Sequence, residues 1–124
     1  MKKDDLPKIV SVFPLSNFII FPKTTVPLNI FEPRYIDMIN DSMRSNKFIG
    51  MIQPRTSAED ITQAPKLHEI GCMGKIMSFK ENDSGQFLIE LKGLIRFKII
   101  DEVKSSKQYR ECEVNFSDFY DDLN

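Results

Sequence analysis

Hydrophobic and polar residues alternate along most of this chain, in short runs rather than long ones. A period of two is typical of a half-buried β-strand, because successive side chains point to opposite faces of a sheet. Prolines interrupt or follow several runs, and since proline cannot donate to a strand ladder, we expect short strands or sheet edges there. The predicted strands cover residues 9–13, 18–21, 26–30, 48–52, 70–79, 87–93, 95–99 and 111–116.

Residues 33–44 have the spacing of an amphipathic helix instead. The apolar stripe of this helix consists of Ile36, Ile39 and Met43. Pro33 suits the first helical position, where a missing N–H costs nothing. We expect the helix to end within residues 45–47, with Asn46 in the left-handed conformation that terminates many helices.

About six to eight short strands and one helix, inserted after the early strands, make a mainly-β (α+β) fold. Strands and helices do not alternate, which excludes a doubly wound sheet and favours a closed or half-closed antiparallel β-barrel. A chain of 124 residues suits a single domain. We expect a flexible charged leader at residues 1–8, the domain at 9–117, and an acidic tail at 118–124 whose aspartates are solvated.

Five pieces of the sequence, taken in order, carry a family resemblance. The pieces are Val-Phe-Pro-Leu at 12–15, Phe-Pro at 21–22, Pro-Leu-Asn-Ile-Phe-Glu-Pro-Arg-Tyr at 27–35, and the glycine-containing runs 71–76 and 93–99. They resemble the LON substrate-binding domain, the N-terminal domain of the ATP-dependent protease Lon, which also occurs in stand-alone proteins. The resemblance covers residues 9–116. It implies a PUA-like antiparallel β-barrel.

The resemblance also implies a function. Such a domain recognises unfolded, misfolded or otherwise marked protein segments, in the context of a protease or chaperone assembly. The ATPase and Ser–Lys protease machinery of the family lie in other domains. The resemblance therefore assigns no catalytic residue to this chain, and we expect no enzymatic activity.

The residues themselves also give no sign of catalysis, a cofactor or a metal. No Gly-x-Ser-x-Gly elbow is present, and the run from Gly71 to Ile76 lacks the spacing and the hydroxyl of a phosphate-binding loop. That run reads instead as a strand in which close packing excludes side chains. No Cys or His pair has zinc-ligand spacing. Cys72 and Cys112 lie in apolar strands, so we expect two buried free thiols.

Several features favour the cytoplasm. Free thiols fit a reducing compartment. The N-terminus lacks the apolar core of a signal peptide, and the longest apolar run, residues 18–21, is too short to span a bilayer.

A net charge of −1 gives little attraction for nucleic acid or for a membrane surface. We therefore expect neither as a partner.

An RNA-binding module is the alternative, because PUA-like barrels also serve RNA. Lys92, Arg96 and Lys98 could share one face of a strand. Against this, acidic residues interleave with the basic ones, and the near-neutral charge attracts phosphate weakly. Steep salt dependence would indicate RNA binding, whereas capture of apolar segments should respond little to salt.

The first group of candidate binding residues is Phe18, Ile20 and Phe21, from a run that is apolar at every position. An extended segment of this kind is either a central strand covered by the helix or an exposed apolar strip. In the second case part of the run forms a shallow groove with Met51 or Met73, because methionine repacks against varied partners.

The second group is Phe31, Glu32, Arg34 and Tyr35, at the entrance to the helix. A polar and aromatic cluster of this kind can contact a partner. It can equally be architecture, with Arg34 bound to a carboxylate or to carbonyls and Tyr35 packed beneath. Arg96 allows the same two interpretations, the structural one being a brace across to an acidic residue of a neighbouring strand.

Overall fold

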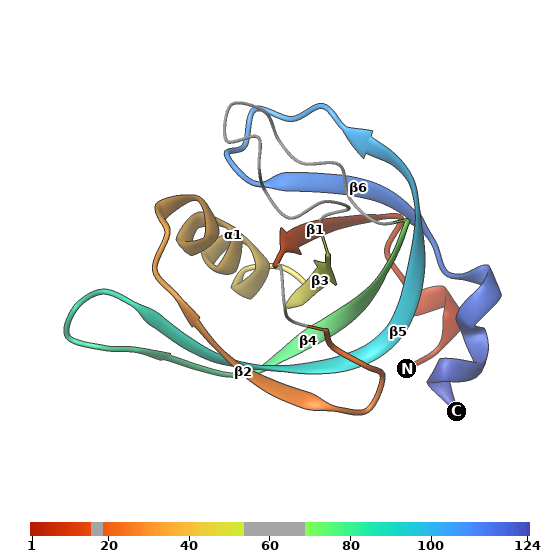
Figure 1. Ribbon diagram of the computed structural model, residues 1–124, viewed down its shortest axis with the longest axis horizontal. Helices are drawn as coiled ribbons and strands as arrows, with labels where there is room; N and C mark the ends of the chain where they lie inside the picture. The colour runs from red at the N-terminus through yellow and green to blue at the C-terminus, as the bar shows by residue number, and fades with distance from the viewer. Residues whose placement is uncertain (16–18, 54–68) are drawn as a thin grey trace.

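The computed structural model of the protein describes residues 1–15, 19–53 and 69–124. These residues form six strands, one α-helix and two short 3-10 helices (Figure 1). Within the described ranges, no helix combines the length and the apolar character needed to cross a bilayer. The elements are β1 (Ile9–Pro14), β2 (Thr25–Ile30), α1 (Pro33–Met43), β3 (Phe48–Ile52), β4 (Ile70–Glu81), β5 (Phe87–Val103) and β6 (Arg110–Asn115), with η1 (Lys3–Asp5) and η2 (Ser117–Leu123) at the ends.

All six strands belong to one sheet, in the order β2-β5-β4-β3-β1-β6. Because β5 also pairs with β6, the sheet closes into a barrel, and β2 lies outside the barrel on the edge of β5. The prediction of a mainly-β barrel with one helix after the early strands is confirmed. One pair differs from the antiparallel prediction. β1 and β3 run parallel, because β2 and α1 supply the long crossover connection that parallel neighbours require.

β5 is one continuous strand where the sequence predicted two shorter ones. Its pairing with β4 shifts in the middle: Met73 pairs with Ile95, but the next residue, Gly74, pairs with Gly93. Leu94 is therefore the extra residue of a β-bulge. Cross-strand partners share a face and neighbours along a strand alternate, so the bulge exchanges the two faces of β5.

This exchange lets β4 and β5 serve two hydrophobic cores. The inner core fills the barrel and includes Val12, Met73, Ile95, Phe97 and Cys112. The outer core lies between the barrel wall, α1 and β2 (Figure 1), and includes Leu28, Tyr35, Met38, Ile39 and Leu91. Both faces of the two long strands are therefore apolar, but over different parts of their length.

α1 covers the outer core with the face that the sequence predicted. Ile39 is fully buried, and Ile36 and Met43 pack at its margin. Pro33 is the first residue of the helix, and Glu32 precedes it in an extended conformation. A proline here is compatible with the helix because the first amides have no intrahelical acceptor.

The left-handed residue that follows α1 is Lys47, with φ 64°, so the prediction of Asn46 was wrong by one position. Asn46 stabilises the turn with its side chain instead. Its Oδ1 accepts a hydrogen bond from the Phe48 N–H at 3.0 Å. Asn side chains commonly support turns by bonding to a backbone group two residues on.

The strand predicted at 18–21 is wrong for the part that the structure describes. Ile19 to Phe21 has no regular secondary structure, and Phe18 lies outside the described residues. The segment leads into a turn in which the Thr24 hydroxyl donates to the Phe21 carbonyl oxygen at 2.7 Å. Pro22, between them, has no N–H to offer a ladder.

Phe21 crosses β5 directly over Gly93. A Cβ atom at Gly93 would lie 2.1 Å from the Phe21 carbonyl oxygen, closer than any side chain could lie. Beside the crossing, the Lys23 N–H donates to the Gly93 carbonyl and the Gly93 N–H donates to the Thr24 carbonyl, both at 2.8 Å. The absence of a side chain at Gly93 is what lets this segment lie against the strand.

The acidic end of the chain is only in part the solvated tail that we predicted: Asp118 and Asp121 are exposed, but Asp122 is not. η2 packs on the barrel, and the Asp122 side chain is 10% exposed because it pairs with Arg96. The half-buried apolar residues of η2 are Phe119, Tyr120 and Leu123, which contact the inner core. The boundaries that we placed at residues 9 and 117 stay predictions.

We expect the Gly93→Ala variant to be less stable than the wild type, because the new methyl group overlaps the Phe21 carbonyl. The free energy of unfolding should fall by roughly 1–3 kcal/mol, as for other overpacking substitutions, and urea denaturation measures it. Gly85→Ala is the control: Gly85 has φ 79° but nothing within 4 Å of its Cβ position. That variant should lose about 1–2 kcal/mol through the left-handed backbone conformation alone, with no contribution from overlap. Equal stability of Gly93→Ala and wild type would contradict the crossing.

Candidate functional site

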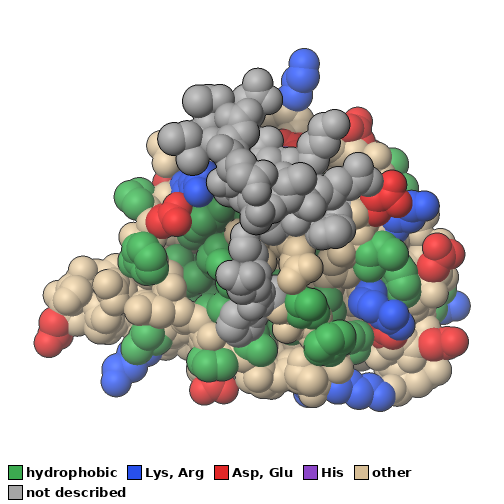
Figure 2. All heavy atoms as spheres, viewed as in Figure 1, with side chains coloured by type: hydrophobic (Ala, Val, Ile, Leu, Met, Phe, Trp, Pro, Cys, Tyr) green, Lys and Arg blue, Asp and Glu red, His purple; other side chains and the backbone are tan. Residues whose placement is uncertain are grey.

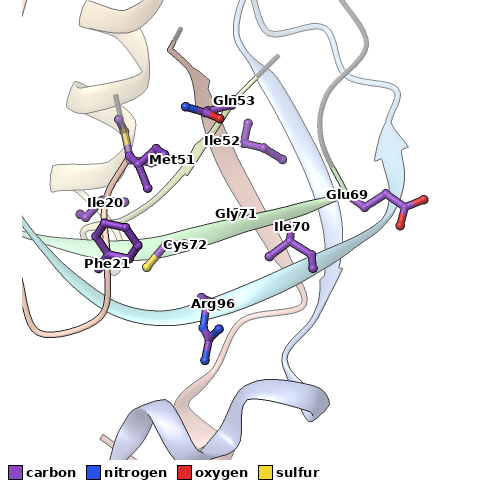
Figure 3. Close-up of a pocket in the computed structure, with 11 residues that line it drawn as sticks. Ile20, Phe21, Met51, Ile52, Gln53, Glu69, Ile70, Gly71, Cys72 and Arg96 are labelled. Atoms are coloured by element: carbon purple, nitrogen blue, oxygen red, sulfur yellow. The ribbon is translucent and has the colours of Figure 1, made fainter. Parts of the chain in front are cut away.

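A cavity of about 590 Å³ lies outside the barrel wall, between β4, the end of β3 and the irregular segment that precedes β2 (Figure 3). Its lining is mostly apolar. The apolar side chains around it are those of Ile19, Ile20, Phe21, Met51, Ile52 and Ile70.

Part of this lining is open to solvent. Ile19, Phe21 and Ile70 are 56%, 59% and 52% exposed, although each is a large apolar residue. On the face shown in Figure 2, hydrophobic side chains gather over the β4–β5 part of the sheet and the segment that leads into β2. Contiguous exposed apolar surface on a small soluble domain typically marks a binding site.

The floor of the cavity contains Gly71. A Cβ atom there would lie 2.6 Å from the Met51 carbonyl oxygen and 2.7 Å from the Phe97 ring. This confirms that the glycine-containing run is a strand in which close packing excludes a side chain. Cys72 continues the floor and is almost fully buried.

Polar groups lie at the margin of the cavity and come from Gln53, Glu69 and Arg96 (Figure 3). Arg96 is held from outside by Asp122: the Nε and Nη2 atoms donate to the two carboxylate oxygens at 3.0 and 2.9 Å. The Arg96 backbone N–H donates to the same carboxylate at 3.0 Å. The brace that we considered for Arg96 therefore exists, but its partner belongs to η2 and not to a neighbouring strand.

The Arg96–Asp122 ion pair shifts the pKa values of both side chains. Hydrogen bonds from Arg96 lower the pKa of Asp122, and the hydrogen bond to Asp122 raises the pKa of Arg96. Because the folded pKa of Asp122 is depressed, its contribution to stability is present above the pKa of an unfolded aspartate, about 3.9. The contribution is lost as the pH falls through the lower folded value. The ion pair is therefore intact at neutral pH.

The two cysteines are buried free thiols, as predicted. Burial raises the pKa of Cys72 to about 12 and the pKa of Cys112 to about 11. A thiol with such a pKa stays protonated at neutral pH and is a poor nucleophile and a poor metal ligand. Within residues 1–15, 19–53 and 69–124, no three His, Cys, Asp or Glu side chains are grouped as a metal site.

A cluster of polar side chains around Asp41 of α1 has a structural role. The Tyr109 hydroxyl donates to Asp41 Oδ2 at 2.6 Å, and Arg44 Nη2 donates to Oδ1 at 2.7 Å. Lys107 lies 3.6 Å from the same carboxylate. These hydrogen bonds, from Tyr109 first, lower the pKa of Asp41. The carboxylate is therefore already engaged in holding α1 to the segment just before β6.

The first group of predicted binding residues is partly brought together here. Ile20, Phe21 and Met51 line the cavity, while Phe18 lies outside the described residues. Met73 does not contribute, since it is fully buried in the inner core on the opposite face of β4. The binding role of these residues stays a prediction.

The second group lies away from the cavity. Tyr35 is buried and its ring stacks on Phe13 with centroids 4.3 Å apart, so it is part of the outer core. Burial raises its pKa. Arg34 donates to Glu32 at 3.0 Å and lies over the Tyr35 ring, and Phe31 is exposed. A role for this group in binding stays a prediction.

The sequence did not identify Ile70, Gln53 or Glu69 as part of a site. Ile70 has the same alternating neighbours as any strand residue, and its exposure follows from its place at the start of β4. Gln53 and Glu69 come together through the barrel topology alone. No local signal in the sequence could have found them.

We expect Cys72 of the folded protein to react with iodoacetamide at pH 8 at least about a thousandfold more slowly than a free thiol, because it is buried and its pKa is raised. Mass spectrometry of the alkylated peptides measures the rate, and the protein unfolded in urea gives the unprotected reference. Alkylation of the folded protein at the unfolded rate would show that the thiol is accessible.

The model of the family described as "ATP-dependent protease La (LON) substrate-binding domain" matches residues 9–123 of the chain. Among curated proteins, the chain is similar to the "Lon protease" of Anaeromyxobacter dehalogenans, with 26% identity over 106 residues, covering 86% of this chain and 13% of that protein. It is similar to the "Lon protease" of Flavobacterium johnsoniae, with 27% identity over 114 residues, covering 92% of this chain and 14% of that protein. The chain thus spans about one seventh of the length of these relatives.

Two solved structures share the fold. One is a Lon N-terminal domain protein from Xanthomonas campestris, with a TM-score of 0.68 and 23% identity over 87% of this chain and 59% of that one. The other is the N-terminal domain of a Lon protease from the Mycobacterium avium complex, with a TM-score of 0.64 and 16% identity over 88% of this chain and 54% of that one.

Proposed function

This chain belongs to the family of ATP-dependent protease La (LON) substrate-binding domains, and we propose that it is a non-catalytic module that binds unfolded or misfolded protein segments. The observation that carries the proposal is the exposed apolar lining of the cavity. Ile19, Phe21 and Ile70 remain more than half exposed in a domain whose other large apolar residues mostly lie in two cores.

The size and chemistry of the cavity suit this role. Pockets that bind small ligands or side chains usually have volumes of about 300–1,000 Å³ and mostly apolar walls, and the value here is about 590 Å³. Unfolded segments differ from folded proteins in exposing large apolar side chains. Removing such surface from water contributes about 25 cal/mol per Å², and the cost of ordering the bound segment is set against this gain. Gln53 at the margin can hydrogen-bond the extended backbone beside a buried residue.

Catalysis is not part of the proposal. The side chains around the cavity offer apolar contact and hydrogen bonds, and its one thiol, Cys72, is protonated at neutral pH. The relatives named Lon protease are about seven times longer than the matched region. We propose that this module passes bound segments to an ATP-dependent protease or a chaperone in the cytoplasm.

The arrangement of basic residues gives no support to RNA binding. Lys92 pairs with Lys75 across the strands, whereas Arg96 pairs with Cys72. Because the bulge at Leu94 lies between them, Lys92 and Arg96 are on opposite faces of β5. Arg96 is also neutralised by Asp122 of η2.

We expect Ile70→Ser to weaken the binding of an unfolded client, reduced and carboxymethylated lactalbumin, by about tenfold, since it removes a half-exposed apolar contact from the cavity. Fluorescence anisotropy of the labelled client measures the affinity. Ile100→Ser is the matched control, because Ile100 is also a strand isoleucine, 54% exposed, and does not line the cavity.

Equal losses in both variants would mean that binding is non-specific, and no loss in either would mean that the client binds elsewhere. Ile20→Asp is not a useful test of the cavity. Ile20 is 4% exposed and belongs to the outer core, so a charge there would unfold the domain.

The salt dependence of binding should be weak, since apolar burial is not screened. We expect the affinity for the client to change by less than about twofold between roughly 50 and 200 mM salt, whereas a module with several phosphate contacts would lose about a thousandfold. The same anisotropy titration at several salt concentrations measures it. A steep loss of client affinity with salt would contradict an apolar site.

A further inference from the structure

η2 contacts both walls of the cavity. On one wall it holds Arg96, whose guanidinium and backbone N–H all donate to the Asp122 carboxylate. On the other it reaches Lys23, whose Nζ donates to the Asn124 carbonyl oxygen just after η2. Lys23 is two residues beyond Phe21, in the segment that carries the exposed apolar lining.

Contacts with the body of the domain hold η2 in place. The Phe119 ring lies beneath the Arg96 guanidinium, 4.8 Å from ring centroid to Cζ, so the arginine contacts an aromatic face as well as a carboxylate. Lys3 from the other end of the chain lies 4.5 Å from the Tyr120 ring centroid. Figure 1 shows η2 beside the N-terminal segment, next to β5.

The two walls of the cavity differ in structure. One wall is the β4–β5 ladder, in which Arg96 is the cross-strand partner of Cys72. The other is an irregular segment attached to β5 by the hydrogen bonds around Gly93. A second attachment, through η2, therefore limits how far the segment can move away from the strand.

We propose that η2 is a clasp that holds the two walls of the cavity at a fixed separation, so that docking of η2 and occupancy of the cavity are coupled. The coupling to a protein segment rests on the proposed function, but the clasp itself does not. A cavity whose walls are held in place binds more tightly than one that must be ordered on binding. Release of the clasp lowers the affinity, and by linkage an occupant strengthens the docking of η2.

The thiol of Cys72 reports the separation of the walls without any client. Asp122→Asn removes the ion pair, and the matched control Asp118→Asn removes the same charge from an exposed position of the same helix. Because burial and, in addition, the Asp122 charge itself raise the pKa of Cys72, Lys23→Gln is measured beside Asp122→Asn: it releases the other wall and leaves that charge in place. We expect Cys72 to be alkylated about tenfold faster than in the wild type in both variants, the effect of losing a charge-assisted hydrogen bond. Cys112, in the inner core, is the internal reference and should keep its rate, as should both cysteines in Asp118→Asn.

Two results would overturn the clasp. One is an unchanged rate at Cys72 in Lys23→Gln, whatever the rate in Asp122→Asn, which would mean that the walls do not depend on η2. The other is equal acceleration at Cys72 and Cys112, which would mean that the substitution only destabilises the whole domain.

The coupling is tested with reduced and carboxymethylated lactalbumin. We expect Asp122→Asn to bind it several-fold more weakly than Asp118→Asn, and the client to slow hydrogen exchange of residues 117–123 in the wild type. Binding without either effect would overturn the coupling. Failure of the wild type to bind at all would overturn the proposed function, while the alkylation rates would still decide the clasp.

Discussion

The contact between two backbones at Gly93 is the constraint on which the rest of the structure depends. The Phe21 carbonyl lies where a side chain of β5 would otherwise stand. The hydrogen bonds beside this contact direct the chain into β2, which pairs with β5 residue by residue from Thr25 to Ile30. β2 in turn carries the chain to α1. The outer core and one wall of the cavity therefore both depend on the absence of a side chain at Gly93.

The bulge at Leu94 has an equally wide effect. Without it, the alternation that buries Ile95 and Phe97 in the barrel would turn the residues before Gly93 away from the outer core. With it, Leu91 and Ile89 face α1 while the later residues face the barrel. One long strand thus takes part in two cores, which a small domain needs because one short barrel encloses little apolar volume.

Local periodicity was enough to predict the elements that depend on local spacing. β2, the helix and its initial proline are where alternation and the 3.6-residue period put them. The irregular path of Ile19–Phe21 was not predictable, because an apolar run of this kind suits a strand equally well. The docking of η2 was not predictable either, because Phe119 and Tyr120 have aspartates as sequence neighbours, and a run of aspartates is typical of a solvent-exposed segment. The cavity joins residues near 20, 52, 70 and 96, which only the closed barrel brings together.

The closure of the barrel between its first and last strands has a consequence for biosynthesis. Ile9 of β1 pairs with Glu113 of β6, so the ring of strands cannot close before nearly the whole domain has been made. At a translation rate of about 5–20 residues per second, β1 waits roughly 5–20 s for its last neighbour. During that time Val10 and Val12, which are buried in the inner core of the folded domain, have no closed barrel in which to be buried. Until the barrel closes, the newly made chain therefore exposes apolar strands that the folded domain buries, and exposed strands of this kind are prone to aggregation.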